Sequence, residues 1–309
     1  MARSAGEAVT APSTSPAPGA VQPFAGRSLW YDAWVVLRRN RAAMFSLFLL
    51  IAMGLLVVAG PWFSPYNFDF TDWESVSAAP SLESGHVFGT DGLGRDLFVR
   101  TLYGGRISLL VGIVATAVSL LIGISYGAVA GYLGGRVDQV MMRIVDILYA
   151  LPFMFLVILL MVFFGRNIVL IFVAIGAINW LDMARIVRGQ TLSLKNREFV
   201  EAAQAGGVST ARIIRRHIVP NLLGVVVVYV TLTIPQVILV ESFLSFLGLG
   251  VQEPMTSWGA LVNEGASEME VAPWMLVFPA IFLTVTLFCF NFLGDGLRDA
   301  LDPRDRSAT

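Results

Sequence analysis

Residues 198–220 read Glu-Phe-Val-Glu-Ala-Ala-Gln-Ala-Gly-Gly-Val-Ser-Thr-Ala-Arg-Ile-Ile-Arg-Arg-His-Ile-Val-Pro and form a polar stretch between two long apolar ones. Ala, Glu and Gln favour a helix at 198–205, and the glycine pair 206–207 is a flexible stop where the chain can reverse. Ser209 or Thr210 can cap a second helix. A membrane protein with such a basic, helix-forming loop on one face offers a docking surface to a soluble partner.

The rest of the chain is too apolar for a soluble domain. Its 309 residues are 56% hydrophobic and only 14% charged, whereas soluble domains have about 25% charged residues. Apolar windows long enough to cross a bilayer as helices lie near 43–62, 107–131, 144–164, 168–187, 222–246 and 275–294. We therefore predict an all-α polytopic membrane protein with about six transmembrane helices.

Charge is distributed unevenly between the segments that join these windows. Arg and Lys gather in both terminal segments and in 188–220. The segments that would lie on the opposite side of the membrane, 63–104 and 241–270, contain few basic residues and many acidic ones. Basic residues accumulate on the cytoplasmic side of membrane proteins. Both termini and the 188–220 loop are therefore predicted to be cytoplasmic.

Three regions follow along the chain. Residues 1–25 are rich in Ala, Ser, Pro and Gly without an apolar run, so we expect a disordered tail and not a signal peptide. Residues 26–104 are expected to hold an anchor helix and an extracytoplasmic loop, which either packs over the spans or contacts an external partner. Residues 105–309 are expected to form the transmembrane core, including the 188–220 loop.

Glycines recur every four residues in the second predicted span, at Gly123, Gly127, Gly131 and Gly135. This spacing places them on one helix face, where the absence of side chains lets another helix approach closely. We predict helix packing along this face.

Polar residues also lie in the fifth predicted span, at Thr233, Gln236 and Glu241. Polar groups at membrane depth normally face other helices or a water-filled cavity. A translocation pathway and hydrogen bonds between helices are both consistent with these residues.

Several chemistries are not supported by the sequence. The single cysteine, Cys289, excludes an internal disulfide, and the isolated His86 and His217 do not suggest a metal site. The only lysine, Lys195, follows Leu194, so the chain lacks the Gly-Lys-Ser/Thr of a phosphate-binding loop. We predict no catalytic site, no metal and no cofactor in this chain, although a membrane enzyme or an autonomous secondary transporter remains an alternative class.

The 198–220 loop has the features of a contact surface. Small residues at Ala202, Ala203 and Gly207 let the backbone sit deep in a groove, and Glu201 can pair with a basic group there. Arginines that can meet acids on the partner or lipid phosphates are Arg212, Arg215 and Arg216. Pro220 is expected to end the loop helix where the fifth span begins. The alternative is an amphipathic helix that lies on the membrane.

The order of Glu201-Ala202-Ala203, three residues, Gly207, nine residues and then His217-Ile218-Val219-Pro220 resembles the EAA loop of ABC importer permeases. His217 and Val219 stand where the general pattern has Ile and Leu. From about Gly26 to Arg306 the chain resembles the C-type permease subunits of bacterial dipeptide, oligopeptide and nickel ABC importers, most of all those for oligopeptides. The stretches that carry this resemblance are Gly26–Trp30, Ser84–Asp91, Gly94–Asp96, Trp180–Lys195, Ser242–Gly250 and Gly294–Pro303.

The resemblance implies a type I ABC importer permease fold in the bacterial cytoplasmic (inner) membrane. It implies a heterodimer with a B-type permease, two cytoplasmic ATPases that bind ATP and Mg²⁺, and an external peptide-binding protein. Glu201, Ala202, Ala203 and Gly207 would then form the ATPase-coupling surface, and oligopeptides would be the cargo. Importers of dipeptides, glutathione or nickel in the same family are the alternatives. Membrane lipid is an expected partner, and nucleic acid is not.

Overall fold

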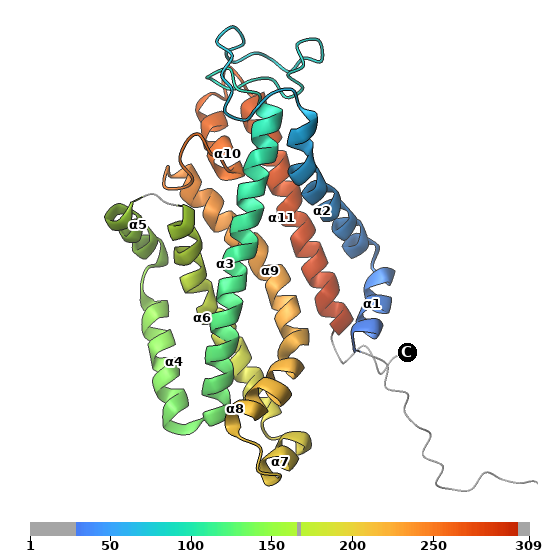
Figure 1. Cartoon of the computed structure of the whole chain (residues 1–309), viewed down its shortest axis with the longest axis vertical. Coiled ribbons are helices and arrows are strands. Elements are labelled where there is room, and N and C mark those ends of the chain that lie inside the picture. The colour runs from blue at the N-terminus through green and yellow to red at the C-terminus, as the bar shows by residue number, and fades with distance from the viewer. Residues whose placement is uncertain (1–28, 166–167, 302–309) are drawn as a thin grey trace, which may run out of the picture.

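Helices form the framework of the computed structural model, which describes residues 29–165 and 168–301 (Figure 1). The predicted disordered tail, 1–25, lies outside the described residues. In chain order the helices are α1 (Leu29–Arg39), α2 (Arg41–Ala59), η1 (Gly60–Phe63), α3 (Leu97–Leu133), α4 (Gly135–Ala150), α5 (Phe153–Phe164), α6 (Ile168–Leu194), α7 (Glu198–Ala205), α8 (Thr210–Ile213), η2 (Ile214–Ile218), α9 (Val219–Phe246), α10 (Trp258–Ser267) and α11 (Trp274–Leu301).

Helices occupy all six predicted spans. Within the described residues, four are long and apolar enough to cross a membrane: α2 with η1, α3, α9 with the turns before it, and α11. A bent pair made of α4 and α5 raises the number to five, and α6 occupies the position of the fourth predicted span.

The third predicted span, 144–164, is not one continuous helix. Its two halves are bent by 80°. Leu151 has an extended backbone, with φ −74° and ψ 135°, and Pro152 follows it before α5 begins. A proline lacks the N–H for a helical hydrogen bond and disfavours helical geometry in the residue before it. The helix therefore breaks here.

The two predicted loops lie at opposite ends of the molecule (Figure 1). The short helices α7 and α8 form one end. The segment between η1 and α3 and the helix α10 form the other. Helices α3 and α9 run between the two ends, whereas α11 runs from the second end to the side of α1 (Figure 1). A movement at one end therefore has two long helices, α3 and α9, through which to reach the other.

The second predicted domain boundary, at 104/105, falls inside α3. This helix begins at Leu97, because Asp96 caps it by accepting a hydrogen bond from the N–H of Val99 at 2.9 Å. The Asp96 carboxylate also lies 2.8 Å from Nδ1 of the buried His86. The outer loop, the segment 64–96 between η1 and α3, is packed against the bundle, since the indole N–H of Trp274 on α11 donates to the carbonyl of Thr90 at 3.2 Å. The loop is therefore ordered, as one of its two interpretations expects, and contact with an external partner stays a prediction.

The most extensive helix packing joins α3 to α6. A Cβ atom at Gly123 would lie 2.5 Å from Cβ of Met183, and one at Gly131 would lie 2.8 Å from the carbonyl oxygen of Arg188. At Gly127 a Cβ atom would overlap the backbone of α6. Since no side chain separates the helices at these points, their backbones approach each other closely.

Gly135 does not belong to this packing surface, so its inclusion in the series was wrong. Helix α3 ends at Leu133, and both Gly134 and Gly135 have positive φ angles, +66° and +56°. No atom lies within 4 Å of where a Cβ of Gly135 would be. Glycine is needed here for a left-handed turn into α4, which carries this residue away from α6.

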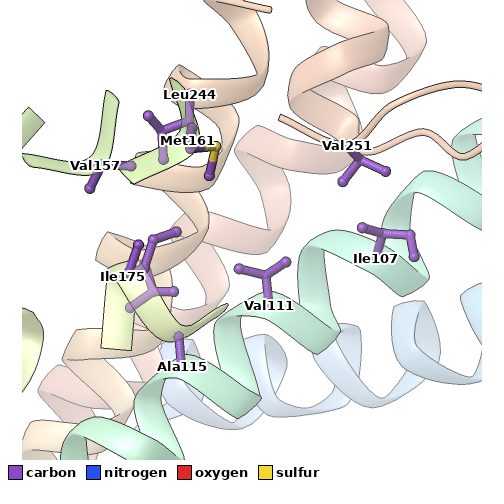
Figure 2. Packing of buried hydrophobic residues seen from close by; sticks show 10 residues of the cluster. Ile107, Val111, Ala115, Val157, Met161, Ile175, Leu244 and Val251 are labelled. Carbon is purple, nitrogen blue, oxygen red and sulfur yellow. The ribbon is translucent and has the colours of Figure 1, made fainter. Parts of the chain in front are cut away.

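A hydrophobic cluster joins α3, α5, α6 and α9 near the middle of the molecule (Figure 2). Its labelled members are Ile107, Val111, Ala115, Val157, Met161, Ile175, Leu244 and Val251. These side chains come from four helices and, for Val251, from the segment after α9. The cluster therefore holds α5 against the bundle although the chain bends sharply before it.

The close contact of α3 with α6 predicts that even a methyl group at Gly127 is destabilising. We expect Gly127→Ala to lower the free energy of unfolding by about 1–3 kcal/mol, because overpacking forces the backbones apart, and Gly127→Leu to lower it further. The measurement is denaturant unfolding of the purified protein in one detergent.

The matched control is Gly189→Ala, because Gly189 lies on α6 with nothing within 4 Å of its Cβ position. Alanine is there expected to be neutral or to stabilise the helix by up to ~1 kcal/mol. Equal stability of all three variants would contradict a close contact between α3 and α6.

Candidate coupling surface and polar networks

The predicted helix at 198–205 is confirmed as α7. Its Val200 is fully buried and anchors the helix to the bundle. Gly207 has a φ of +74° and no atom within 4 Å of its Cβ position, so glycine permits the left-handed turn there. Helix α8 begins after Ser209, although the Ser209 side chain makes no capping hydrogen bond.

The residues predicted to contact a soluble partner lie mostly on the exposed side of this end. Those exposed are Glu201, Ala202, Gly207, Arg212, Arg215 and Arg216. Ala203 differs, because it is half-buried and packs against the hydrophobic cluster that includes Val200 and Ile213. The available surface therefore has an acidic residue and small residues on α7 and arginines on the turns that follow.

A continuous helix leads from this surface into the bundle. It spans Thr210–Phe246, 37 residues, and contains one π-helical turn at Ile214–Ile218, closed by a hydrogen bond from the N–H of Val219 to the carbonyl of Ile214. The prediction that Pro220 ends the loop helix is wrong. Pro220 lies in the first turn of α9, and the wider π turn before it accommodates a residue without an N–H.

Both sides of the candidate surface are fixed to other helices. The buried side chains Ile218 and Leu222 pack in one cluster with Met183 of α6. The amide of Gln204 donates a hydrogen bond to the hydroxyl of Tyr132, 3.0 Å away at the end of α3. A displacement of α7 and α8 would therefore act on α3, α6 and α9 together.

Two ion pairs join α4 to α6. Arg188 donates two hydrogen bonds to Asp138, at 2.5 and 2.6 Å, and Arg185 donates one to Asp146 at 2.8 Å. The Arg185 guanidinium also lies 4.4 Å from the ring centre of Tyr149. These contacts hold the amphipathic α4 beside α6 and provide planar bidentate pairing at Asp138.

The three predicted pathway residues do not share one accessible surface. Gln236 is exposed on α9. Thr233 is buried, and its hydroxyl donates to the carbonyl of Tyr229 at 2.8 Å. Glu241 is fully buried. Of these three residues, only Gln236 has an exposed side chain in this conformation.

Glu241 instead lies at the centre of a hydrogen-bonded network between helices. Ser108 of α3 donates to its carboxylate at 3.2 Å, and Ser245 of α9 donates at 2.7 Å. The N–H of Trp258 donates to Ser108, and Ser257 lies 3.1 Å from Ser245, oxygen to oxygen. The interhelical interpretation therefore fits Glu241, and the network fixes the start of α10 against α3 and α9.

A second network, not recognised from the sequence, lies nearer the opposite end from α7. Asp91 pairs with Arg95 at 2.7 Å and with the fully buried Arg100 at 3.2 Å. Arg100 donates to both carboxylate oxygens of Glu264 at 3.1 Å, and Arg95 donates to Glu253 at 3.1 Å. These ion pairs join the outer loop, α3, α10 and the segment before α10.

The environment changes the acidity of two members of this network. At Glu264, burial raises the pKa above its ordinary value, and the charge of Arg100 offsets part of this effect. At Arg95, burial acts to lower the pKa, but the charges and hydrogen bonds of Asp91 and Glu253 outweigh it and leave the pKa raised. Arg95 therefore stays charged, and Glu264 protonates at a higher pH than an exposed glutamate.

One signal in the sequence could have indicated this network. Asp91 and Arg95 are four residues apart, and Arg100 follows nine residues after Asp91, shortly before the apolar window that begins at 107. The other acidic partner of Arg100 could not be identified in the same way, because Glu264 is 164 residues further along the chain. Within the described residues, His, Cys, Asp and Glu do not gather in a group of three or more that could hold a metal ion.

Comparisons with known proteins agree with this architecture. The family described as "Binding-protein-dependent transport system inner membrane component" matches residues 119–307, and "N-terminal TM domain of oligopeptide transport permease C" matches residues 28–80. The first match includes α6 to α11 and therefore both the candidate coupling surface and the helix that leads from it.

Individual relatives cover nearly the whole chain. The oligopeptide transport system permease protein OppC of Escherichia coli K12 is 64% identical over 91% of this chain and 93% of its own length. That of Haemophilus influenzae is 62% identical over 91% and 90%. The dipeptide transport system permease protein DppC of Bacillus subtilis is 49% identical over 89% and 86%. The chain thus belongs to the family of binding-protein-dependent transport system inner membrane components.

Proposed function

We propose that this protein is the transmembrane permease subunit of an ATP-driven oligopeptide importer, in which it forms half of the translocation pathway. The observation that carries the proposal is the single helix Thr210–Phe246, which connects an exposed surface at one end to the buried network of Glu241. A soluble ATPase bound at α8 and the arginines after it can push on this helix directly, because α8 is its first turn. The close oligopeptide permease relatives support the same role.

The importer would need several subunits, because this chain lacks the Gly-Lys-Ser/Thr of a phosphate-binding loop. ATP and Mg²⁺ would be bound by two partner ATPases, and a B-type permease would supply the other half of the pathway. An external binding protein would deliver the peptide at the end opposite to α7. Helix α9 packs against α3, α6 and α11, so a displacement of α9 would change how these helices line the pathway.

Oligopeptides are the preferred cargo over dipeptides. The two oligopeptide relatives share 64% and 62% identity with the chain, and the dipeptide relative shares 49%. Peptides of varied sequence have only their backbone in common, and an exposed amide such as that of Gln236 can hydrogen-bond to a backbone N–H or carbonyl.

The coupling role predicts that a charge reversal on α7 blocks transport. We expect Glu201→Lys together with Ala202→Trp to lower peptide uptake at least about tenfold, ~1.4 kcal/mol in rate terms, because a docking charge is reversed and bulk is placed where the ATPase backbone must approach. Both side chains are exposed, so the protein should still fold. Substitution of Gly207 is avoided because its positive φ would strain any side chain.

The control for this prediction is Asp299→Lys, which reverses an exposed acid on α11. Uptake and copurification of the ATPase should both remain at the wild-type level in the control. Uptake by the double variant within about twofold of wild type, under roughly 0.5 kcal/mol, would refute the assignment of the docking surface.

The proposed orientation places α7 and both termini in the cytoplasm. In a Cys289→Ser background, an impermeant maleimide should label Glu74→Cys in intact spheroplasts and should label Asn196→Cys only after permeabilisation. Both positions are exposed, so the difference reports the side of the membrane. Labelling of Asn196→Cys in intact spheroplasts would show that the orientation is reversed.

The pathway role of Gln236 predicts a transport defect without loss of assembly. We expect Gln236→Leu to lower peptide uptake several-fold, because a leucine cannot hydrogen-bond to a peptide backbone, and Gln236→Asn to restore part of it. Uptake and the thermal stability of the purified complex are measured together. Normal uptake combined with lowered stability would instead mean that Gln236 bonds a neighbouring subunit.

A further inference from the structure

Helix α1 carries an apolar surface that nothing else in the described chain covers. Its aromatic residues Trp30, Tyr31 and Trp34 are 48%, 60% and 44% exposed. Val35 is exposed beside them. We call these four residues the α1 apolar surface.

A different part of α1 is used for packing within the chain. Ala33 and Leu37, one turn apart, are buried against Ala300 near the end of α11, where Leu297 and Leu301 also pack. The helix is therefore fixed in place by a narrow strip of small and aliphatic side chains. The large aromatic side chains are not needed for this contact and point elsewhere.

Basic residues lie next to the α1 apolar surface. Arg38, Arg39 and Arg41 are exposed at the junction of α1 and α2. The Arg38 guanidinium lies over the ring of Trp34, 5.8 Å from its centre, within the range of a cation–π contact. Such side chains keep their charge in water while their stem covers apolar surface.

Lipid is the occupant that fits both features. Trp and Tyr have an apolar body and a polar tip and concentrate where the hydrocarbon of a bilayer meets its head groups. Arginines on an amphipathic helix pair with anionic head groups. A protein partner would need a matching cluster of acids beside an apolar groove, whereas an anionic membrane supplies phosphates and hydrocarbon together.

Apolar side chains are also exposed on the transmembrane helix that follows α1. On α2, the side chains of Phe45, Phe48 and Ile51 are 65%, 68% and 54% exposed. They begin one turn beyond Arg41, at the end of the span where head groups would lie. The α1 apolar surface therefore directly precedes, along the chain, the part of α2 that is suited to hydrocarbon.

We infer that α1 is an interfacial anchor, whose apolar surface lies at the boundary of hydrocarbon and head groups and whose arginines bind anionic lipid. Through its contact with Ala300, this anchor holds the end of α11 at the membrane surface. The inference does not depend on the substrate or on the ATPase docking surface.

Spin labels on the complete importer, reconstituted in vesicles of equal parts phosphatidylcholine and phosphatidylglycerol, test this inference. In a Cys289→Ser background, nitroxides are attached to Trp30→Cys, Trp34→Cys and, as the control, Asp32→Cys. Trp30 and Trp34 are one turn apart on the same face of α1, and Asp32 lies on the opposite side of this helix. Labels at 30 and 34 should be more accessible to oxygen than to a water-soluble nickel chelate, and the label at 32 should show the reverse.

Other results at these positions would overturn the inference. Nickel accessibility at 30 and 34 equal to that at 32 would place the helix in water. Protection of 30 and 34 from both reagents would mean that a protein partner covers the surface.

The role of the arginines has a separate readout. In vesicles of phosphatidylcholine alone, the labels at 30 and 34 should shift toward the aqueous pattern, and Arg38→Gln with Arg39→Gln should produce the same shift in the mixed vesicles. Peptide uptake by the complex is measured in parallel, so a failure of the transport proposal is distinguishable. An oxygen accessibility that is the same in both vesicles and in the arginine variant would refute anionic lipid binding.

Discussion

The backbone contact between α3 and α6 is the constraint on which the helix arrangement depends. In a bilayer, helices gain little from hiding apolar side chains, because lipid is equally apolar, so association relies on close packing and interhelical hydrogen bonds. Gly123, Gly127 and Gly131 provide that packing over two turns of the helix. Because α6 is held there, Arg188 can reach Asp138 and keep α4 beside the bundle.

Buried polar networks also restrict how the helices can be arranged. A buried carboxylate or guanidinium is costly unless its hydrogen bonds are satisfied by partners. Glu241 finds hydroxyls on α3 and α9, and Arg100 finds carboxylates from the outer loop and α10. Each network therefore permits few helix arrangements, and together they fix α10 and the outer ends of α3 and α9.

The candidate coupling region has a turn at Gly207 and a continuous helix after it. Gly207 turns the chain in open space, whereas the segment from Thr210 onward is continuous helix. The π turn before Pro220 keeps that continuity, because it absorbs the missing backbone donor without a break. The contrast with Pro152, where the backbone becomes extended and α4 and α5 diverge, shows that the geometry around a proline decides whether a helix continues.

Local properties of the sequence determined the membrane class, the positions of the helices, the short helix at 198–205 and three of the four packing glycines. Hydropathy, helix propensity and residue spacing suffice for these features, because they act over a few helical turns.

The tertiary structure alone decided how the similar polar residues of α9 differ. Gln236 is exposed and Glu241 is buried, because the position of α3 and α10 around α9 determines which side is covered. It also decided the pairing of Arg95 with Glu253, which are 158 residues apart. Such pairs depend on which helices become neighbours, and no local pattern in the chain specifies that.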